Sequence, residues 1–193
     1  ALLPRGILHL GVIGKKANLT SGCFAHLPPG LIYCNIDQLV GSVPGSEIQH
    51  LNRRMLHLYL NSSSVVGLEP SHLPPSLTLF CSYGYGKGKL KEAWLPALPN
   101  SLKSLATDTS ELSADALVDA LPPNLTSLFL RGFRSNELDP QNLTRLPSTL
   151  TLLDASPIPH LDDHFLASLP RGLRSLHVDA TNQLTEDGLA HLP

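Results

Sequence analysis

The sequence has little charge, few aromatic side chains and no long hydrophobic run. Charged residues make up 16% of its 193 positions, aromatic residues 5%, and the formal net charge is −2. A protein that binds nucleic acid through the phosphate backbone needs a broad basic surface, which this composition excludes. No apolar segment approaches the roughly 18 residues that a membrane-spanning helix needs. We therefore expect neither a nucleic-acid partner nor a membrane span.

Cysteine is also scarce. The chain has three cysteines, Cys23, Cys34 and Cys81, an odd number without paired spacing, so no disulfide framework is predicted. Proline, by contrast, is frequent, with 17 residues. Most prolines belong to one recurring phrase, so their number does not indicate disorder.

That phrase reads Leu-Pro-x-x-Leu-x-x-Leu and recurs every 22 to 25 residues; we call it the anchor phrase. A degenerate copy, LNRRMLHL, fills the one gap in the series. The eight copies begin at Leu3, Leu27, Leu51, Leu73, Leu98, Leu121, Leu146 and Leu169. A fixed period with variable filling is typical of a solenoid. We expect residues 1–193 to form one repeat domain. Since the chain begins and ends within a repeat, we also expect it to be part of a longer chain.

Each repeat predicts a short strand. With the first Leu of the anchor phrase at offset zero, apolar residues recur at +4, +7 and +9, as at Leu125, Leu128 and Leu130. Alternation between +7 and +9 is a strand period, so +7 and +9 face inward, and +6, +8 and +10 face outward. Stacking the repeats pairs these strands into a parallel sheet.

The second half of the better repeats predicts a short helix. Ser113, Asp162 and Thr185 are candidate N-caps, and Asp139 precedes a proline at a first helical position. Each helix runs into Leu-Pro, where the proline ends it. Helices of one or two turns need the neighbouring repeat to cover their apolar side.

A strand and a short helix with leucines at these offsets resemble the leucine-rich repeat family over essentially the whole chain. The best copy is LRSLHVDATNQLTEDGLAHLP, from Leu173 to Pro193. The anchor phrase is similar to proline-containing variants in bacterial effectors and protist repeat proteins. The resemblance implies an α/β solenoid, a horseshoe with a concave parallel sheet and short convex helices. The family places Asn or Cys near +12 to bind the turn backbone; only Asn182 resembles it here, so other groups must satisfy these turns.

In this family partners dock on the concave sheet, so the outward offsets give the candidate site. We predict that aromatic and charged residues there bind a protein partner, since Tyr and Arg are enriched at binding hot spots. The predicted residues are Tyr33, Tyr59, Tyr83, Phe129, Arg131, Asp154 and His177. Alternatively, the tyrosines only cover their neighbours. The glycine- and lysine-rich segment 82–94 is either a flexible loop beside this face or a solvated loop without a role.

Three other features give only weak indications of a metal site or a reactive thiol. His26, His50 and His72 each precede an anchor phrase, but His191 shares that position alone, and a helix C-terminus favours histidine without any metal. Cys34 is expected to be a small buried side chain. Cys81 is expected to point outward and is the one plausible reactive thiol, without a base placed to activate it. We predict no catalytic residue, no metal and no cofactor.

The sequence therefore predicts a protein–protein interaction module rather than an enzyme. Two alternatives remain: the substrate-recognition domain of a larger enzyme, such as a ubiquitin ligase or bacterial effector, and an extracellular adhesion or receptor ectodomain. Glycosylation sequons occur at Asn18, Asn61, Asn124 and Asn142, but they arise partly from the repeated sequence itself and are weak evidence for a secreted protein. A cytoplasmic setting is therefore preferred. Self-association through uncapped repeat ends is expected.

Overall fold

The computed structural model describes residues 3–12, 21–36, 42–61, 65–83, 90–108, 112–131, 140–156, 162–179 and 184–192. The chain forms two compact units. The first comprises Ala1–Lys89 with Ala97–Leu102, and the second comprises Leu90–Pro96 with Lys103–Pro193. No helix in the described part of the chain is long and apolar enough to cross a membrane.

The first unit pairs strands with 3-10 helices. Its four main strands are parallel and follow one another in the order β1-β2-β4-β6. Its elements are β1 (His9–Val12), η1 (Cys23–His26), β2 (Tyr33–Ile36), β3 (Val43–Pro44), η2 (Gly45–His50), β4 (His57–Asn61), β5 (Val65–Val66), η3 (Pro70–His72) and β6 (Leu79–Tyr83). The helices η1, η2 and η3 are all of the 3-10 type, with four, six and three residues.

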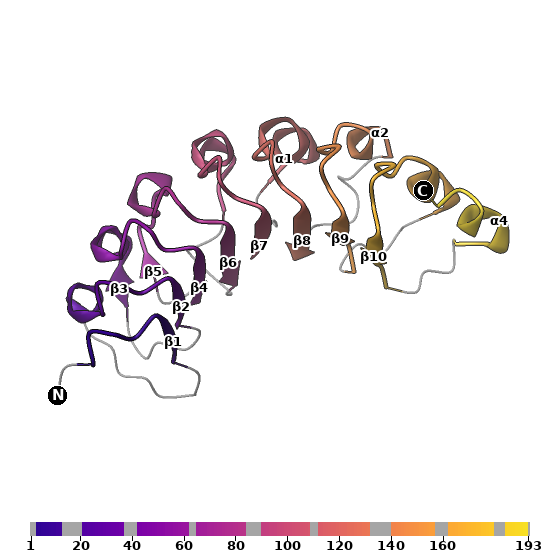
Figure 1. Cartoon of the computed structure of the whole chain (residues 1–193). Helices are drawn as coiled ribbons and strands as arrows, with labels where there is room; N and C mark the ends of the chain where they lie inside the picture. The colour runs from indigo at the N-terminus through magenta and orange to yellow at the C-terminus, as the bar shows by residue number, and fades with distance from the viewer. Residues whose placement is uncertain are drawn as a thin grey trace. The chain divides into compact units, whose positions relative to one another are not determined.

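The second unit pairs strands with α-helices. Its strands follow the order β7-β8-β9-β10. Its elements are β7 (Ser104–Asp108), α1 (Ala114–Ala120), β8 (Ser127–Arg131), α2 (Pro140–Leu143), β9 (Leu152–Asp154), α3 (Asp163–Ala167), β10 (Ser175–His177) and α4 (Glu186–Leu189). The 3-10 helix η4 (Glu92–Ala97) precedes β7. In each unit the strands line one side of the repeats and the helices the opposite side (Figure 1).

The predicted register of the strands is confirmed within each unit. In the first unit, His9 pairs with Tyr33, Tyr33 with His57, and His57 with Leu79, all at offset +6. In the second unit, Ser104, Ser127, Leu152 and Ser175 follow one another at the same offset. Because side chains alternate along a strand, one shared register fixes which residues share a face for every repeat.

The core lies between strands and helices, as the alternation predicts. The inward residues of β4 and β8, Leu58, Leu60, Leu128 and Leu130, are all at most 2% exposed. Each such leucine contributes about 1.5–3 kcal/mol to the free energy of folding through burial of apolar surface. The inward-facing apolar residues of each repeat hold the short helices against the strands.

All eight anchor phrases form the same turn. The backbone N–H at offset +4 donates to the carbonyl at +1, as from Leu77 to Pro74 at 3.2 Å and from Leu173 to Pro170 at 3.0 Å. The degenerate copy makes this turn with Asn52 in place of proline, and Met55 N–H donates to Asn52 at 2.9 Å. The proline is therefore not needed for the turn itself.

Side-chain hydroxyl groups at offset +3 satisfy backbone carbonyls of the anchor-phrase turns. Ser76 Oγ lies 2.6 Å from the Arg53 carbonyl and 2.8 Å from the Met55 carbonyl, both in the preceding repeat. Ser101 and Thr149, at the same offset +3, contact the equivalent carbonyls one repeat earlier at 2.7–3.2 Å. These contacts link successive repeats within each unit.

The predicted helix caps are present. The side chains of Ser113, Asp162 and Thr185 accept hydrogen bonds from the third backbone N–H beyond them and begin α1, α3 and α4. The fourth candidate, Asp139, lies outside the described residues, as does Asn182.

Candidate functional site

The strongest candidate site is a cluster of four rings on the outward face of β1, β2 and β4, which we call the aromatic cluster. His9 and Tyr33 stack with ring centroids 5.7 Å apart and an interplanar angle of 17°. Tyr33 also meets His57 edge-on at 6.1 Å and Tyr59 at 5.5 Å with a tilt of 45°. Tyr33 therefore contacts each of the other three rings.

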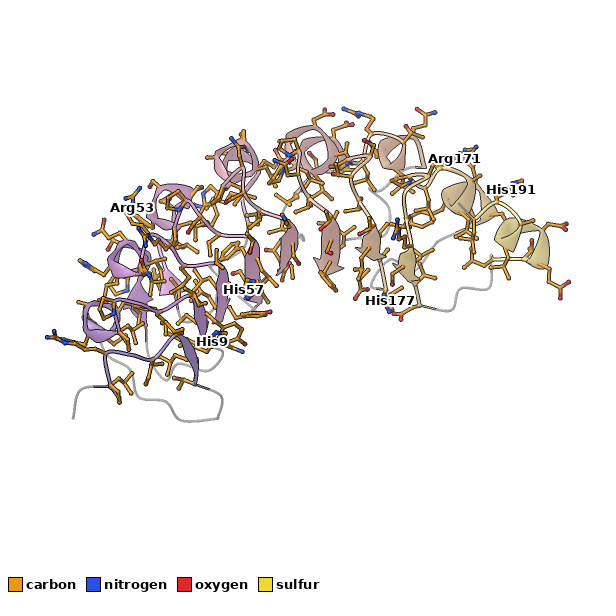
Figure 2. All side chains as sticks on the ribbon, in the orientation of Figure 1. His9, Arg53, His57, Arg171, His177 and His191 are labelled. Carbon is orange, nitrogen blue, oxygen red and sulfur yellow. The ribbon has the colours of Figure 1, made fainter. Side chains whose placement is uncertain are left out.

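The cluster follows from the strand register. His9, Tyr33 and His57 occupy offset +6 in three successive repeats, and Tyr59 occupies +8 on the same face. Strands in a sheet lie about 4.8 Å apart, so side chains at one offset meet across the sheet. In Figure 2, His9 and His57 lie on the strand side of the first unit.

Burial in the cluster is partial. Tyr33, His57 and Tyr59 are half-buried, and His9 is exposed. Partial burial raises the pKa of Tyr59, with a smaller contribution from the neighbouring Tyr33, so its hydroxyl stays neutral and able to donate a hydrogen bond. These rings leave part of their surface available to a partner while their packing restricts their motion.

Among the described residues, the side chains at offsets +6 and +8 of β1, β2 and β4 include no carboxylate and no ammonium group. The other side chain at these offsets, Asn35 on β2, lies in register between Gly11 and Tyr59. The Asn35 Oδ1 atom is buried and has no hydrogen-bond partner. A buried acceptor without a partner costs stability unless a donor reaches it. This face combines aromatic rings with one amide group that a ligand's donor could satisfy.

In the second unit the predicted residues lie next to one another at offset +8. Phe129 on β8 is paired with Asp154 on β9, and Asp154 with His177 on β10. Phe129 and Asp154 are half-buried, whereas His177 is exposed. The Asp154 carboxylate accepts the Ser156 backbone N–H at 3.1 Å, which holds the side chain at the end of its strand.

The structure fixes the backbone, but not the side chains, of the other two predicted residues. Tyr83 ends β6 opposite Asn61, and Arg131 ends β8 opposite Asp108. Their side chains lie outside the described part of the chain, as do residues 84–89 of the glycine- and lysine-rich segment 82–94. At the end of that segment, Lys91 Nζ lies 5.6 Å from the centroid of the Trp94 ring.

The expectation that the Cys81 side chain is accessible on the outward face is wrong. Cys81 has the predicted register beside Tyr59, but its side chain is only 4% exposed. Cys34 is fully buried, as predicted, and burial raises its pKa to about 12. A thiol held in its protonated form is a poor nucleophile.

The three histidines that precede anchor phrases end 3-10 helices. His26 ends η1, His50 ends η2, and His72 ends η3, where its Nδ1 accepts the Glu69 backbone N–H at 3.1 Å. Within the described residues no group of three His, Cys, Asp or Glu side chains could hold a metal ion. His72 thus has a capping role.

Sequence reasoning missed His9 and His57 as part of the candidate site. The repeat period places both histidines at the outward offset +6, but the predicted binding residues are tyrosines, Phe129, Arg131, Asp154 and His177. The signal that could have found them is the run His-Tyr-His at +6 in three successive repeats, since stacked repeats bring such residues together.

The comparison with solved structures identifies the class of fold. The chain is similar to the crystal structure of the leucine-rich repeat-containing protein LegL7 from Legionella pneumophila, with a TM-score of 0.54 and 18% sequence identity. The similarity covers 88% of this chain and 66% of that chain. No family model and no curated protein matches this sequence. The fold is therefore an α/β solenoid of the leucine-rich-repeat type; at this identity the likeness concerns the fold alone.

Proposed function

We propose that this chain is a protein-interaction module that binds its partner through the outward face of the sheet. The observation that carries the proposal is the aromatic cluster, in which His9, His57 and Tyr59 contact Tyr33 on three adjacent strands. Half-buried aromatic side chains on a rigid sheet lose little conformational entropy on binding, and tyrosine is enriched at binding hot spots.

We propose further contact residues in each unit, taken separately, at the offsets that the sequence indicates. They are Tyr83 in the first unit and Phe129, Arg131, Asp154 and His177 in the second. Aromatic residues would supply apolar contact area, while Arg131, Asp154 and His177 would set specificity by pairing with polar groups of the partner. On this proposal the chain binds and does not catalyse.

An extracellular role has less support. The Asn142 side-chain nitrogen, the atom to which a glycan would be attached, donates to Asp115 Oδ1 at 3.0 Å. Arg145 Nη1 contacts the same carboxylate at 2.6 Å. These contacts join α2 to α1. A glycan on Asn142 would compete with this packing, so we prefer the interaction module without glycosylation at that position.

The test is affinity capture from the source lysate with matched pairs of variants. His9→Ala with His57→Ala removes two rings of the aromatic cluster. His26→Ala with His50→Ala removes two exposed histidines from the opposite, helix side of the same repeats. We expect the first pair, and Tyr33→Ala with Tyr59→Ala, to lose a protein that the wild type and the second pair retain.

Folding is checked by circular dichroism and thermal unfolding of every variant. A partner that is retained by all folded variants would move the binding site away from this face. A partner that is lost only from the His26 and His50 pair would place the site among the 3-10 helices. Either result would contradict the proposal.

A further inference from the structure

The first unit has a cavity on its helix side. It has a volume of about 260 Å³ and lies between three successive anchor phrases. Its apolar walls come from Ile48, Leu51, Leu73, Pro74, Ala97 and Pro99. Three of these, Ile48, Leu51 and Leu73, are at most 6% exposed and belong to the core, so the walls are rigid.

The polar groups of the cavity are mostly hydrogen-bond donors. Arg53, Gln49, His72 and Ser71 contribute to its lining, and no acidic residue does. His72 Nδ1 already accepts a hydrogen bond from the Glu69 N–H, so in the neutral ring the proton is on Nε2, which is left as a donor. Together with the guanidinium of Arg53, this gives the cavity a positive, donor-rich rim above apolar walls.

Arg53 is available to an external anion. It is exposed, and among the described residues no carboxylate forms an ion pair with it. Figure 2 places Arg53 on the side of the 3-10 helices, opposite His9 and His57. An arginine binds a carboxylate through two parallel hydrogen bonds, which makes it selective for that geometry.

The repeat departs from its own pattern at this cavity. The anchor phrase that begins at Leu51 has Asn52 where the other copies have proline, whereas the arginine that follows, Arg53, has counterparts at Arg5 and Arg171. Asn52 still makes the common turn, and its side chain donates to the Leu31 carbonyl at 3.3 Å and accepts from the Arg54 N–H at 3.0 Å. The departure is not required by the turn, and it lies next to Arg53, which is one of the residues that line the cavity.

We propose that this cavity binds a small organic carboxylate with an aliphatic chain, the carboxylate on Arg53 and the chain against the leucine and proline walls. Ligand pockets for drug-sized molecules have volumes of roughly 300–1,000 Å³, so a cavity of about 260 Å³ fits a smaller molecule. The site is separate from the sheet face proposed for the protein partner, and either can exist without the other.

The test uses octanoate as the probe and the whole chain labelled with ¹⁵N. Octanoate is expected to shift the amide signals of Ser71, His72 and Ala97 in a saturable titration. Octanamide, which has the same chain without the charge, is expected to bind about tenfold more weakly or worse, because it lacks the charge-assisted hydrogen bonds.

Two variants define the site. Arg53→Gln should weaken octanoate binding about tenfold, whereas Arg171→Gln, at the same offset of another anchor phrase, should leave it unchanged. Ala97→Phe, at an exposed position, should fill the cavity and abolish the shifts while the strand signals remain in place.

The proposal is overturned by any of three results. These are no saturable shift with millimolar octanoate, equal binding of octanoate and octanamide, and an equal loss of affinity in Arg53→Gln and Arg171→Gln. Binding of a peptide that ends in leucine, with no binding of octanoate, would also overturn it, because the ligand would then be a chain terminus rather than a free molecule.

Discussion

Single hydroxyl groups at offset +3 connect neighbouring repeats. Ser76, Ser101 and Thr149 each contact two carbonyls of the preceding anchor phrase. A hydroxyl has one proton, which is shared between the two carbonyls. This arrangement ties the anchor-phrase turns of successive repeats together, and the sequence could not indicate it because serine and threonine are also common in loops.

Removing one of these hydroxyl groups should destabilise its unit. Ser76→Ala leaves two carbonyls of the Arg53–Met55 turn without that donor, so the free energy of unfolding should fall by about 1–3 kcal/mol. Ser148→Ala, at an exposed position, should have no measurable effect. Urea unfolding followed by circular dichroism measures both; equal stability of the two variants would contradict the role of the Ser76 hydroxyl.

Glu47 makes the first unit sensitive to acid. The Ser21 hydroxyl and the Gly22 N–H both donate to Glu47 Oε1 at 2.6 Å, and the residue is only 8% exposed. The hydrogen bond from Ser21 is the main cause that lowers the pKa of this carboxyl, and burial partly opposes it. Because the folded pKa is below the unfolded pKa, the stabilisation is present above the unfolded pKa and is lost as the pH falls through the folded pKa.

The wild type should therefore lose stability between about pH 5 and pH 3 more steeply than Glu47→Gln. Glu186→Gln removes the same charge from an exposed position and serves as the control. Unfolding free energies measured across this pH range give the comparison. A wild type whose pH dependence is identical to that of Glu47→Gln would show that the Ser21 and Gly22 contacts do not stabilise the carboxylate.

At the scale of elements, η2 packs against the next repeat without room for a side chain at Gly45. A Cβ atom there would clash with both Cα and N of Leu68. These are backbone atoms, which cannot move without disturbing β5. Gly45→Ala should therefore cost about 1–3 kcal/mol of unfolding free energy or more.

Gly6→Ala is the matched control, because nothing lies within 4 Å of a Cβ at that position. Thermal unfolding of both variants tests the prediction. If Gly45→Ala melts at the temperature of Gly6→Ala, the close approach of η2 to Leu68 does not constrain the fold.

The sequence predicted some elements better than others for physical reasons. Strands and their register follow from the leucine period, and the caps at Ser113, Asp162 and Thr185 are local signals. The 3-10 form of η1 to η4 and the small parallel sheet of β3 and β5 depend on packing between repeats, which no local pattern encodes. The cavity beside Arg53 has the same origin, since four successive repeats contribute to it.

At the scale of the molecule, exposed leucines favour association of the chain with a second copy. Leu3 and Leu8 in the first unit are 41% and 51% exposed, and Leu189 and Leu192 in the second are 56% and 42% exposed. Apolar side chains grouped at the first and last described repeats are expected to mediate self-association.

Light scattering across a concentration series should show a mass that increases with concentration. Leu8→Gln with Leu189→Gln should shift the chain toward the monomer without lowering its melting temperature, because both residues are exposed. A monomer at every concentration would exclude this association.

Hydrogen–deuterium exchange of the chain, alone and with its captured partner, tests the proposed interaction surface most directly. The account predicts that the partner slows exchange in β1, β2 and β4, beneath the aromatic cluster, and leaves η1, η2 and η3 unchanged. Slower exchange confined to those 3-10 helices, with unchanged strands, would contradict binding through the outward face of the sheet.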